Sequence, residues 1–337
     1  MQKLHKHISS RAASLAVAAL LAGVATNAAS ATQWEAQAGA QSGDLGNQAL
    51  AFLPNEFWIH AGDSIHWTFR TAEIHTVTFL KPGQTRPPLN SSLGTFVGCP
   101  GTTSDGSSFD GSACVSNATS TTGQTYTVNF PATGNFKLVC LVHSRMTGAI
   151  HVLPLSETLP YDQAFYEMQA TRAQGELLFV ALGLEGLGIA EGQRTSAHEV
   201  TAGVSAILAN GGGSQTAAVM RFLGATTVVH VGDTVEWTNL SAPPFHTITF
   251  GTEPANLMPP SPGMVLDADG VRHAVISSPN ASVNSGFLGS PNQETVGQPQ
   301  GPLDFTRFRV TFTAPGRFNY ICGLHDLLGM IGTVIVQ

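Results

Sequence analysis

The chain contains two copies of one pattern, and this repeat constrains the fold more than any other feature of the sequence. Four blocks occur twice, in the same order. They are QALAFLPNEFWIHAGD and AAVMRFLGATTVVHVGD with one gap (48–63 and 217–233), HAGDSIHWT and HVGDTVEWT (60–68 and 230–238), EIHTVTF and PFHTITF (73–79 and 244–250), and FPATGNFKLVC and FTAPGRFNYIC (130–140 and 312–322). Matched blocks in a fixed order indicate repeated structural units, so we expect two tandem domains of one fold.

Each copy is rich in short β-prone runs that are separated by turn residues. The 337 residues include 36 glycines and 19 prolines, which is typical of many strands joined by tight turns. We expect strands at 64–69, 75–79, 136–139 and 149–153 in the first copy, and at 234–239, 246–250, 318–321 and 332–336 in the second. This pattern predicts an all-β sandwich or barrel for each copy.

The segment between the copies has a different pattern. Apolar residues recur at helical spacing from Tyr161 to Met168, and Pro160 suits the first turn of a helix. We therefore expect residues 156–196 to form a linker with one amphipathic helix. The helix is expected to end at the glycines that follow, which are Gly183, Gly186, Gly188 and Gly192. The flanking domains are then predicted at 32–155 and 197–337.

The N-terminus has the features of an export signal. Basic residues precede an apolar run at 12–24, which is shorter than the roughly 20 residues needed to span a bilayer. Ala29-Ser30-Ala31 fits a cleavage site, so a signal peptide is predicted at 1–31. No later segment is expected to cross a membrane, and the mature protein is predicted to be periplasmic or secreted. In such an oxidising compartment we expect Cys99 and Cys114 to form a disulfide.

The ends of the matched blocks contain residues of one chemical kind. Each copy has a cysteine, a histidine three positions later, a methionine soon after, and an upstream histidine in the H-T-V/I-T-F block. The candidate ligands are His75, Cys140, His143 and Met146 in the first copy, and His246, Cys322, His325 and Met330 in the second. A thiolate, two imidazoles and a weak thioether form the ligand set of a blue-copper site. Structural zinc sites use no methionine, so we expect one copper ion in each copy.

These motifs resemble those of the cupredoxins, the blue-copper family that includes plastocyanin, amicyanin and pseudoazurin. The short loop after Cys140 is similar to that of amicyanin, and the longer loop after Cys322 is similar to those of plastocyanin and pseudoazurin. The resemblance covers most of residues 34–153 and 198–337. It implies a Greek-key β-sandwich for each domain, one type 1 copper ion per domain, and single-electron transfer.

The two predicted sites are not expected to be equivalent. The first ligand loop contains Arg145, whereas the second contains Asp326. A nearby cation disfavours the more positive Cu(II) form and an anion favours it, so we predict that the first site is the more oxidising. Insertions at 80–124 and 251–304 are candidates for covering a site or docking a partner.

Three classes of function remain to be compared. A two-domain copper oxidoreductase of the nitrite-reductase type would have a histidine beside the type 1 cysteine, but Leu141 and Gly323 follow the cysteines here. Copper storage or delivery would favour Met- or His-rich tracts, which the sequence does not contain. We therefore predict an electron carrier rather than an enzyme, with the other two classes as alternatives. Its partners are expected to be a redox protein donor and acceptor; the net charge of −7 argues against nucleic acid.

Overall fold

The computed structural model describes residues 31–84, 86, 103–117, 119–192, 198–239, 244–257, 259–289 and 306–337. Residues 31–337 form one compact unit. Apart from Ala31, the predicted signal peptide lies outside the described residues, and so do large parts of both predicted insertions. Cys99 also lies outside them, so its disulfide with Cys114, which is buried, stays a prediction.

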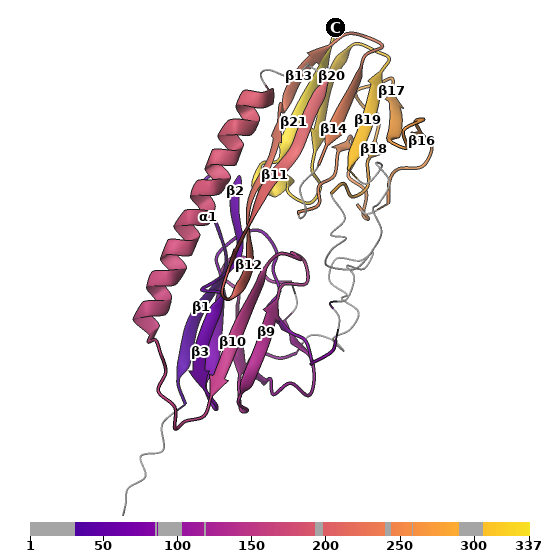
Figure 1. The fold of residues 1–337 in the computed structure, drawn as a ribbon. Coiled ribbons are helices and arrows are strands. Elements are labelled where there is room, and N and C mark those ends of the chain that lie inside the picture. The colour runs from indigo at the N-terminus through magenta and orange to yellow at the C-terminus, as the bar shows by residue number, and fades with distance from the viewer. Residues whose placement is uncertain are drawn as a thin grey trace, which may run out of the picture. The chain divides into compact units, whose positions relative to one another are not determined.

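The largest element is an 11-stranded sheet with strands from both repeats (Figure 1). In spatial order its strands are β16 (Val265–Leu266), β17 (Arg272–Ile276), β19 (Arg307–Phe312), β14 (Thr234–Thr238), β11 (Glu199–Asn210), β12 (Gly213–Leu223), β2 (Asn47–Leu53), β1 (Gln33–Gln41), β4 (Ser64–Phe69), β8 (Thr125–Asn129) and β6 (Ser107–Ser108). The repeats meet where β12 pairs antiparallel with β2, with Ala217 opposite Ala49 and Ala218 opposite Gln48. All four residues are fully buried, so this junction belongs to the interior.

Each repeat adds a 5-stranded sheet that packs against its part of the large sheet. The first contains β3 (Glu56–His60), β10 (Thr147–Leu153), β9 (Gly134–Val139), β5 (Thr78–Phe79) and β7 (Val115–Ser116). The second contains β13 (Thr226–Val229), β21 (Ile331–Val336), β20 (Gly316–Ile321), β15 (Thr249–Phe250) and β18 (Val283–Asn284). Alternate residues of β4 and β14 face the two cores, with Trp67 and Trp237 fully buried at matched positions. The predicted all-β fold of two tandem sandwiches is confirmed.

The strands expected at 75–79 and 246–250 are shorter than predicted, because regular pairing is confined to β5 and β15. The histidine that begins each run forms an isolated bridge with a neighbouring segment instead: His75 with Ser120, and His246 with Leu288. Each histidine therefore lies just outside the regular sheet, on backbone that is still hydrogen-bonded.

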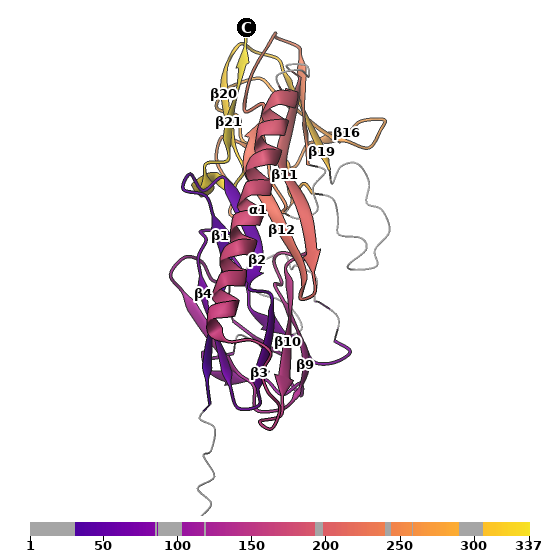
Figure 2. The same cartoon turned by 60° about the vertical axis from the view of Figure 1, so that its left-hand side comes forward.

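Between the repeats lies α1 (Gln163–Gly192), a longer helix than expected. The carboxylate of Asp162 accepts a hydrogen bond from the backbone N–H of Phe165 at 2.9 Å and so caps its first turn. Figures 1 and 2 show α1 running along the large sheet. Ala170, Leu177 and Ala181 are buried in this contact, which involves strands β1, β2 and β12.

The prediction that glycines end this helix is wrong, since α1 continues through Gly183, Gly186 and Gly188. Glycine lowers helix propensity, but packing on a sheet stabilises a helix more than propensity does. Gly188 also allows the close approach of Leu223, because a Cβ at this position would collide with its side chain. Tertiary contacts therefore determine the length of α1.

The helix is not amphipathic either. Its exposed side chains include large apolar ones, among them Met168, Phe179, Leu182 and Leu187. By length and composition, the segment Gln163–Ala190 is apolar enough to cross a membrane, so the expectation that no later segment meets this criterion is wrong. In the structure, one side of this helix covers the large sheet.

Candidate metal centres

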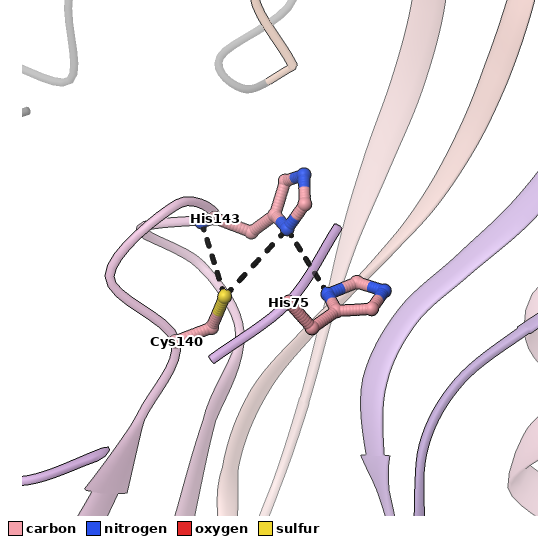
Figure 3. Close-up of side chains that lie close together, drawn as sticks. All are labelled: His75, Cys140 and His143. Atoms are coloured by element: carbon pink, nitrogen blue, oxygen red, sulfur yellow. Dashed lines mark hydrogen bonds between the residues drawn. The ribbon is translucent and has the colours of Figure 1, made fainter. Parts of the chain in front are cut away.

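Three side chains of the first repeat converge around the loop between β9 and β10 (Figure 3). Cys140 directly follows β9, His143 lies further along the loop, and His75 comes from the segment before β5. The Nδ1 atom of His143 lies 3.7 Å from the Sγ atom of Cys140 and 3.2 Å from the Nδ1 atom of His75. All three residues are buried, so three potential ligand atoms meet at one point that is shielded from water.

Backbone hydrogen bonds keep this loop closed. The amide of Cys140 donates to the carbonyl of Met146, and the amide of Met146 donates to the carbonyl of His143, each at 3.0 Å. The amides of Thr76 and His143 also donate to the Cys140 sulfur, each at 3.4 Å. Two N–H groups directed at one sulfur favour its thiolate form. Met146, fully buried in the same core as Cys140, completes the predicted set.

The second repeat reproduces the arrangement. Cys322 follows β20, and the loop to β21 contains the short 3-10 helix η2 (Asp326–Leu328). The Cys322 sulfur lies 3.4 Å from Nδ1 of His325 and 3.7 Å from Nδ1 of His246, and the two nitrogens are 3.0 Å apart. The Cys322 amide donates to the carbonyl of Met330 at 3.0 Å, and Met330 is fully buried. Both predicted sets of residues are thus brought together.

A glycine that the sequence analysis did not single out lies against the upstream histidine of each cluster. Gly39 and Gly203 both have a φ angle of 72° and lie where the pairing register of β1 and β11 shifts. A Cβ on Gly39 would lie 2.5 Å from Nε2 of His75, and a Cβ on Gly203 would collide with the same atom of His246. Each bulge therefore needs glycine to make room for an imidazole ring. A matched Ala-Gly pair in the first strand of each copy is the sequence signal for these positions.

Glu73 is a second residue that the sequence analysis missed. Its carboxylate is buried between the repeats, with Oε1 lying 3.2 Å from Nε2 of His143 and Oε2 lying 3.4 Å from Nε2 of His325. One side chain therefore contacts a histidine of each cluster. In the repeat alignment Glu73 corresponds to Pro244, so the second copy has no equivalent acid. This break in a well-matched block is the only sequence signal for its role.

The side chains of the two clusters perturb one another strongly. Burial by itself raises the pKa of Cys140 and Cys322, but the adjacent imidazoles outweigh it and hold both values well below the usual range of a thiol. Burial lowers the pKa of His143, but contacts with the Cys140 thiol and the Glu73 carboxylate raise it to about 9. The pKa of His325 is raised to about 10, because Glu73 and Cys322 again outweigh burial. The thiolate is thus the favoured form of each cysteine, which is the form that binds metals.

The charges around the clusters differ between the repeats. Two arginines, Arg145 and Arg86, lie close to Cys140. Burial and the charge of Arg145 lower the pKa of Arg86, and they outweigh the Cys140 thiolate, which raises it. Two acids, Asp326 and Glu253, lie close to Cys322. The pKa of Glu253 is raised, mainly by burial and also by the negative charges of Asp326 and Cys322. Apart from Glu73, which both clusters share, the charged residues named near the first cluster are therefore cationic and those near the second are anionic.

A cavity of about 440 Å³ lies between the repeats beside Glu73. Its wall includes His143 and His325, and much of the remaining lining is apolar. Val142, Phe245, Leu257, Phe287, Leu324 and Leu328 contribute to it. The outer edges of both imidazoles therefore border a largely apolar pocket.

The donor atoms fit copper. A soft thiolate beside two imidazole nitrogens suits both oxidation states of that metal, and the loops need no rearrangement to bring the three donors together. A β-sandwich that buries a cysteine between two histidines is typical of metal-binding proteins, and this chain contains two of them.

Comparisons with known proteins identify the family. The model of the family described as "Copper binding proteins, plastocyanin/azurin family" matches residues 39–153 and 209–337. The chain therefore belongs to the plastocyanin/azurin family of copper-binding proteins, and it contains two copies of the domain. The resemblance drawn from the ligand motifs is confirmed.

Solved structures that are similar to part of this chain include a plastocyanin and an amicyanin. Oxidised plastocyanin from Dryopteris crassirhizoma is 20% identical, with 41% of this chain and 99% of that chain covered and a TM-score of 0.21. Amicyanin from Paracoccus versutus (Thiobacillus versutus) is 19% identical, with 37% and 83% covered and a TM-score of 0.23. The search of curated proteins found no match.

Proposed function

We propose that this protein is an exported electron carrier with two type 1 copper ions, one in each repeat. His75, Cys140, His143 and Met146 would hold the first ion, and His246, Cys322, His325 and Met330 the second. The observation that supports this most directly is the pair of matched, buried His/Cys/His clusters in a chain of the copper-binding family. A bound copper ion would supply a one-electron redox couple, and a soluble redox protein would act as donor and another as acceptor.

The protein contributes rigidity and shielding to this function. Both cysteines and both upstream histidines are fully buried, and the loops are closed by backbone hydrogen bonds to the methionines. Such fixed surroundings hold the donor atoms in one arrangement, which suits a metal that changes oxidation state without changing its ligands. Met146 and Met330, whose backbones close the two loops, would supply the weak axial sulfur.

The test of this proposal is the spectrum and metal content of the purified protein. We expect two copper ions per chain and an intense blue thiolate-to-copper band that bleaches on reduction. A colourless protein that binds only Cu(I) would instead support the storage or delivery alternative. The predicted start of the mature chain at Thr32 is checked by mass spectrometry of the exported protein.

The oxidoreductase alternative requires a separate measurement. We propose a carrier because Leu141 and Gly323, and not histidines, follow the two cysteines. The copper-loaded protein is therefore expected to show no steady-state reduction of nitrite or oxygen beyond that of free copper. Sustained turnover that disappears in a Cys140→Ser or Cys322→Ser variant would assign the protein to the oxidoreductase class.

A further inference from the structure

The buried carboxylate of Glu73, which lies between the two clusters, has no counterpart in the second repeat. Glu73 belongs to the first repeat, yet its two oxygens face one histidine of each repeat, at 3.2 and 3.4 Å. Glu73 is 5% exposed, and His143 and His325 are 2% and 3% exposed. Because all three side chains are almost fully buried, these hydrogen bonds are stronger than contacts on the open surface would be.

We propose that Glu73 is a shared positioning residue that orients one metal-binding histidine in each repeat and so couples the two sites. This inference rests on the proposed copper function. It adds that a single side chain of the first repeat controls the affinity and the reduction potential of both sites.

The chemistry of imidazole explains how the carboxylate would act. Nδ1 of His143 and of His325 faces the cysteine sulfur, so this nitrogen must carry a free lone pair to bind a metal. A carboxylate at Nε2 keeps the proton on the outer nitrogen and fixes the orientation of the ring. Each oxygen of Glu73 can serve one ring, which is why one acid suffices for two sites.

The upstream histidines are held in another way. The Nε2 atoms of His75 and His246 are buried and have no hydrogen-bond partner among the residues that the structure describes, and Gly39 and Gly203 lie against them. Packing fixes these two rings, whereas hydrogen bonds to Glu73 fix the other two. Substitution of Glu73 therefore acts on one histidine in each site and leaves the other in place.

The position of Glu73 is itself tied to the junction of the repeats. Its amide donates to the hydroxyl of Thr71 at 3.0 Å, and that hydroxyl donates to the side chain of Gln48 on β2. Gln48 lies opposite Ala218 of β12, in the strand pair that joins the repeats. Through Thr71 and Gln48, Glu73 is thus connected to the strand pair β2–β12 that joins the two repeats.

The experiment compares Glu73→Ala and Glu73→Gln with a matched control. Copper affinity is measured by competition with a chelator, and potentials are measured in the Cys140→Ser and Cys322→Ser backgrounds, where one site remains. The control is Glu56→Gln, because Glu56 contacts His151 at 3.2 Å, which is also a carboxylate–imidazole pair of the first repeat but belongs to neither cluster. Thermal unfolding of the metal-free variants shows whether each variant folds.

We expect Glu73→Ala to weaken copper binding at both sites by roughly 10- to 100-fold, as loss of a ligand-orienting partner commonly does. Glu73→Gln removes the negative charge near both sites, so both potentials should rise. Its amide can accept a hydrogen bond from only one of the two histidines, so the sites should lose unequal amounts of affinity. The decisive measurement is the reduction potential of the second site in the Cys140→Ser background. The Glu73 substitution lies in the first repeat, so a shift at the second site shows that it acts across the repeats.

Three results would overturn the inference. One is a change confined to the first site, which would make Glu73 a residue of its own repeat alone. Another is a pair of potentials that match the Glu56→Gln control. The third is a third metal ion that is lost in Glu73→Ala, which would make Glu73 a ligand. Failure of the proposed function itself would appear separately, as a wild-type protein without the thiolate-to-copper band.

Discussion

The two clusters have similar inner dimensions, with imidazole Nδ1 atoms 3.2 Å apart in the first and 3.0 Å apart in the second. Their surroundings differ: Arg145 and Arg86 lie near the first, and Asp326 and Glu253 lie near the second. The copies thus preserve the residues that converge on the metal position, while the charges around it have diverged. The arrangement of the clustered side chains has therefore changed less between the copies than the charges around them.

The largest expected effect is the loss of one site without the other. Cys140→Ser should remove one of two copper ions and its thiolate band, and Cys322→Ser should do the same for the second repeat, because a hydroxyl is a poor ligand for a soft metal. Metal analysis and absorption spectra check this. Loss of both ions in either single variant would mean that the clusters do not bind independently, and one ion in the wild type would contradict the two-site assignment.

A smaller effect is expected from the glycines that face the upstream histidines. Gly39→Ala and Gly203→Ala should each destabilise the metal-free protein by more than the about 1–2 kcal/mol that left-handed backbone costs a non-glycine residue. Each should also weaken copper binding in its own repeat, since the new Cβ displaces an imidazole.

The matched controls are Gly62→Ala and Gly232→Ala, measured by thermal unfolding and copper titration. These glycines also have positive φ angles, of 99° and 93°, but a Cβ there would meet no atom within 4 Å. They should show the backbone cost and normal copper affinity. Equal copper affinities in all four variants would show that the bulges do not position the rings.

The two sites should also differ in reduction potential. The cations near the first cluster disfavour Cu(II) and the anions near the second favour it, so the first site is predicted to be the more oxidising. Electron flow from the second repeat to the first would then be downhill. Redox titration of the Cys140→Ser and Cys322→Ser variants tests the order, and equal or reversed potentials would show that these charges do not control it.

The smallest effects come from single charges. Arg145→Gln should lower the potential of the first site and Asp326→Asn should raise that of the second, each by the equivalent of about 1 kcal/mol or less for half-buried charges. Both shifts should shrink as salt is added, because the screening length falls to about 8 Å at physiological ionic strength. Shifts that do not change with salt would indicate a structural cause.

The candidate metal clusters could be predicted because most of their geometry is local. Cys140, His143 and Met146 lie on one short loop, so their spacing alone indicates that they converge. The repeat then supplied the upstream histidines and the all-β fold. Each of these inferences depends on a pattern within a few residues or on the comparison of the two copies.

The features that sequence reasoning missed depend on contacts between distant segments. Glu73 meets His325 only because β2 and β12 bring the repeats together, and the mismatch with Pro244 marks Glu73 as unusual without indicating that partner. The continuation of α1 through Gly183 and Gly186 likewise depends on a sheet surface elsewhere in the chain. Helix propensity and periodicity describe the segment alone and cannot include that surface.

The pairing of β2 with β12 also bears on how such a chain can change over generations. A gene duplication normally leaves two units that can later be lost, exchanged or moved independently. Here, separation would leave each half with an unpaired strand edge whose residues, such as Ala49 and Ala217, are fully buried in the joined form. Bare edges of this kind promote aggregation. Because the two copies share one sheet, loss of either copy would expose the other, and we expect the two copies to be inherited together.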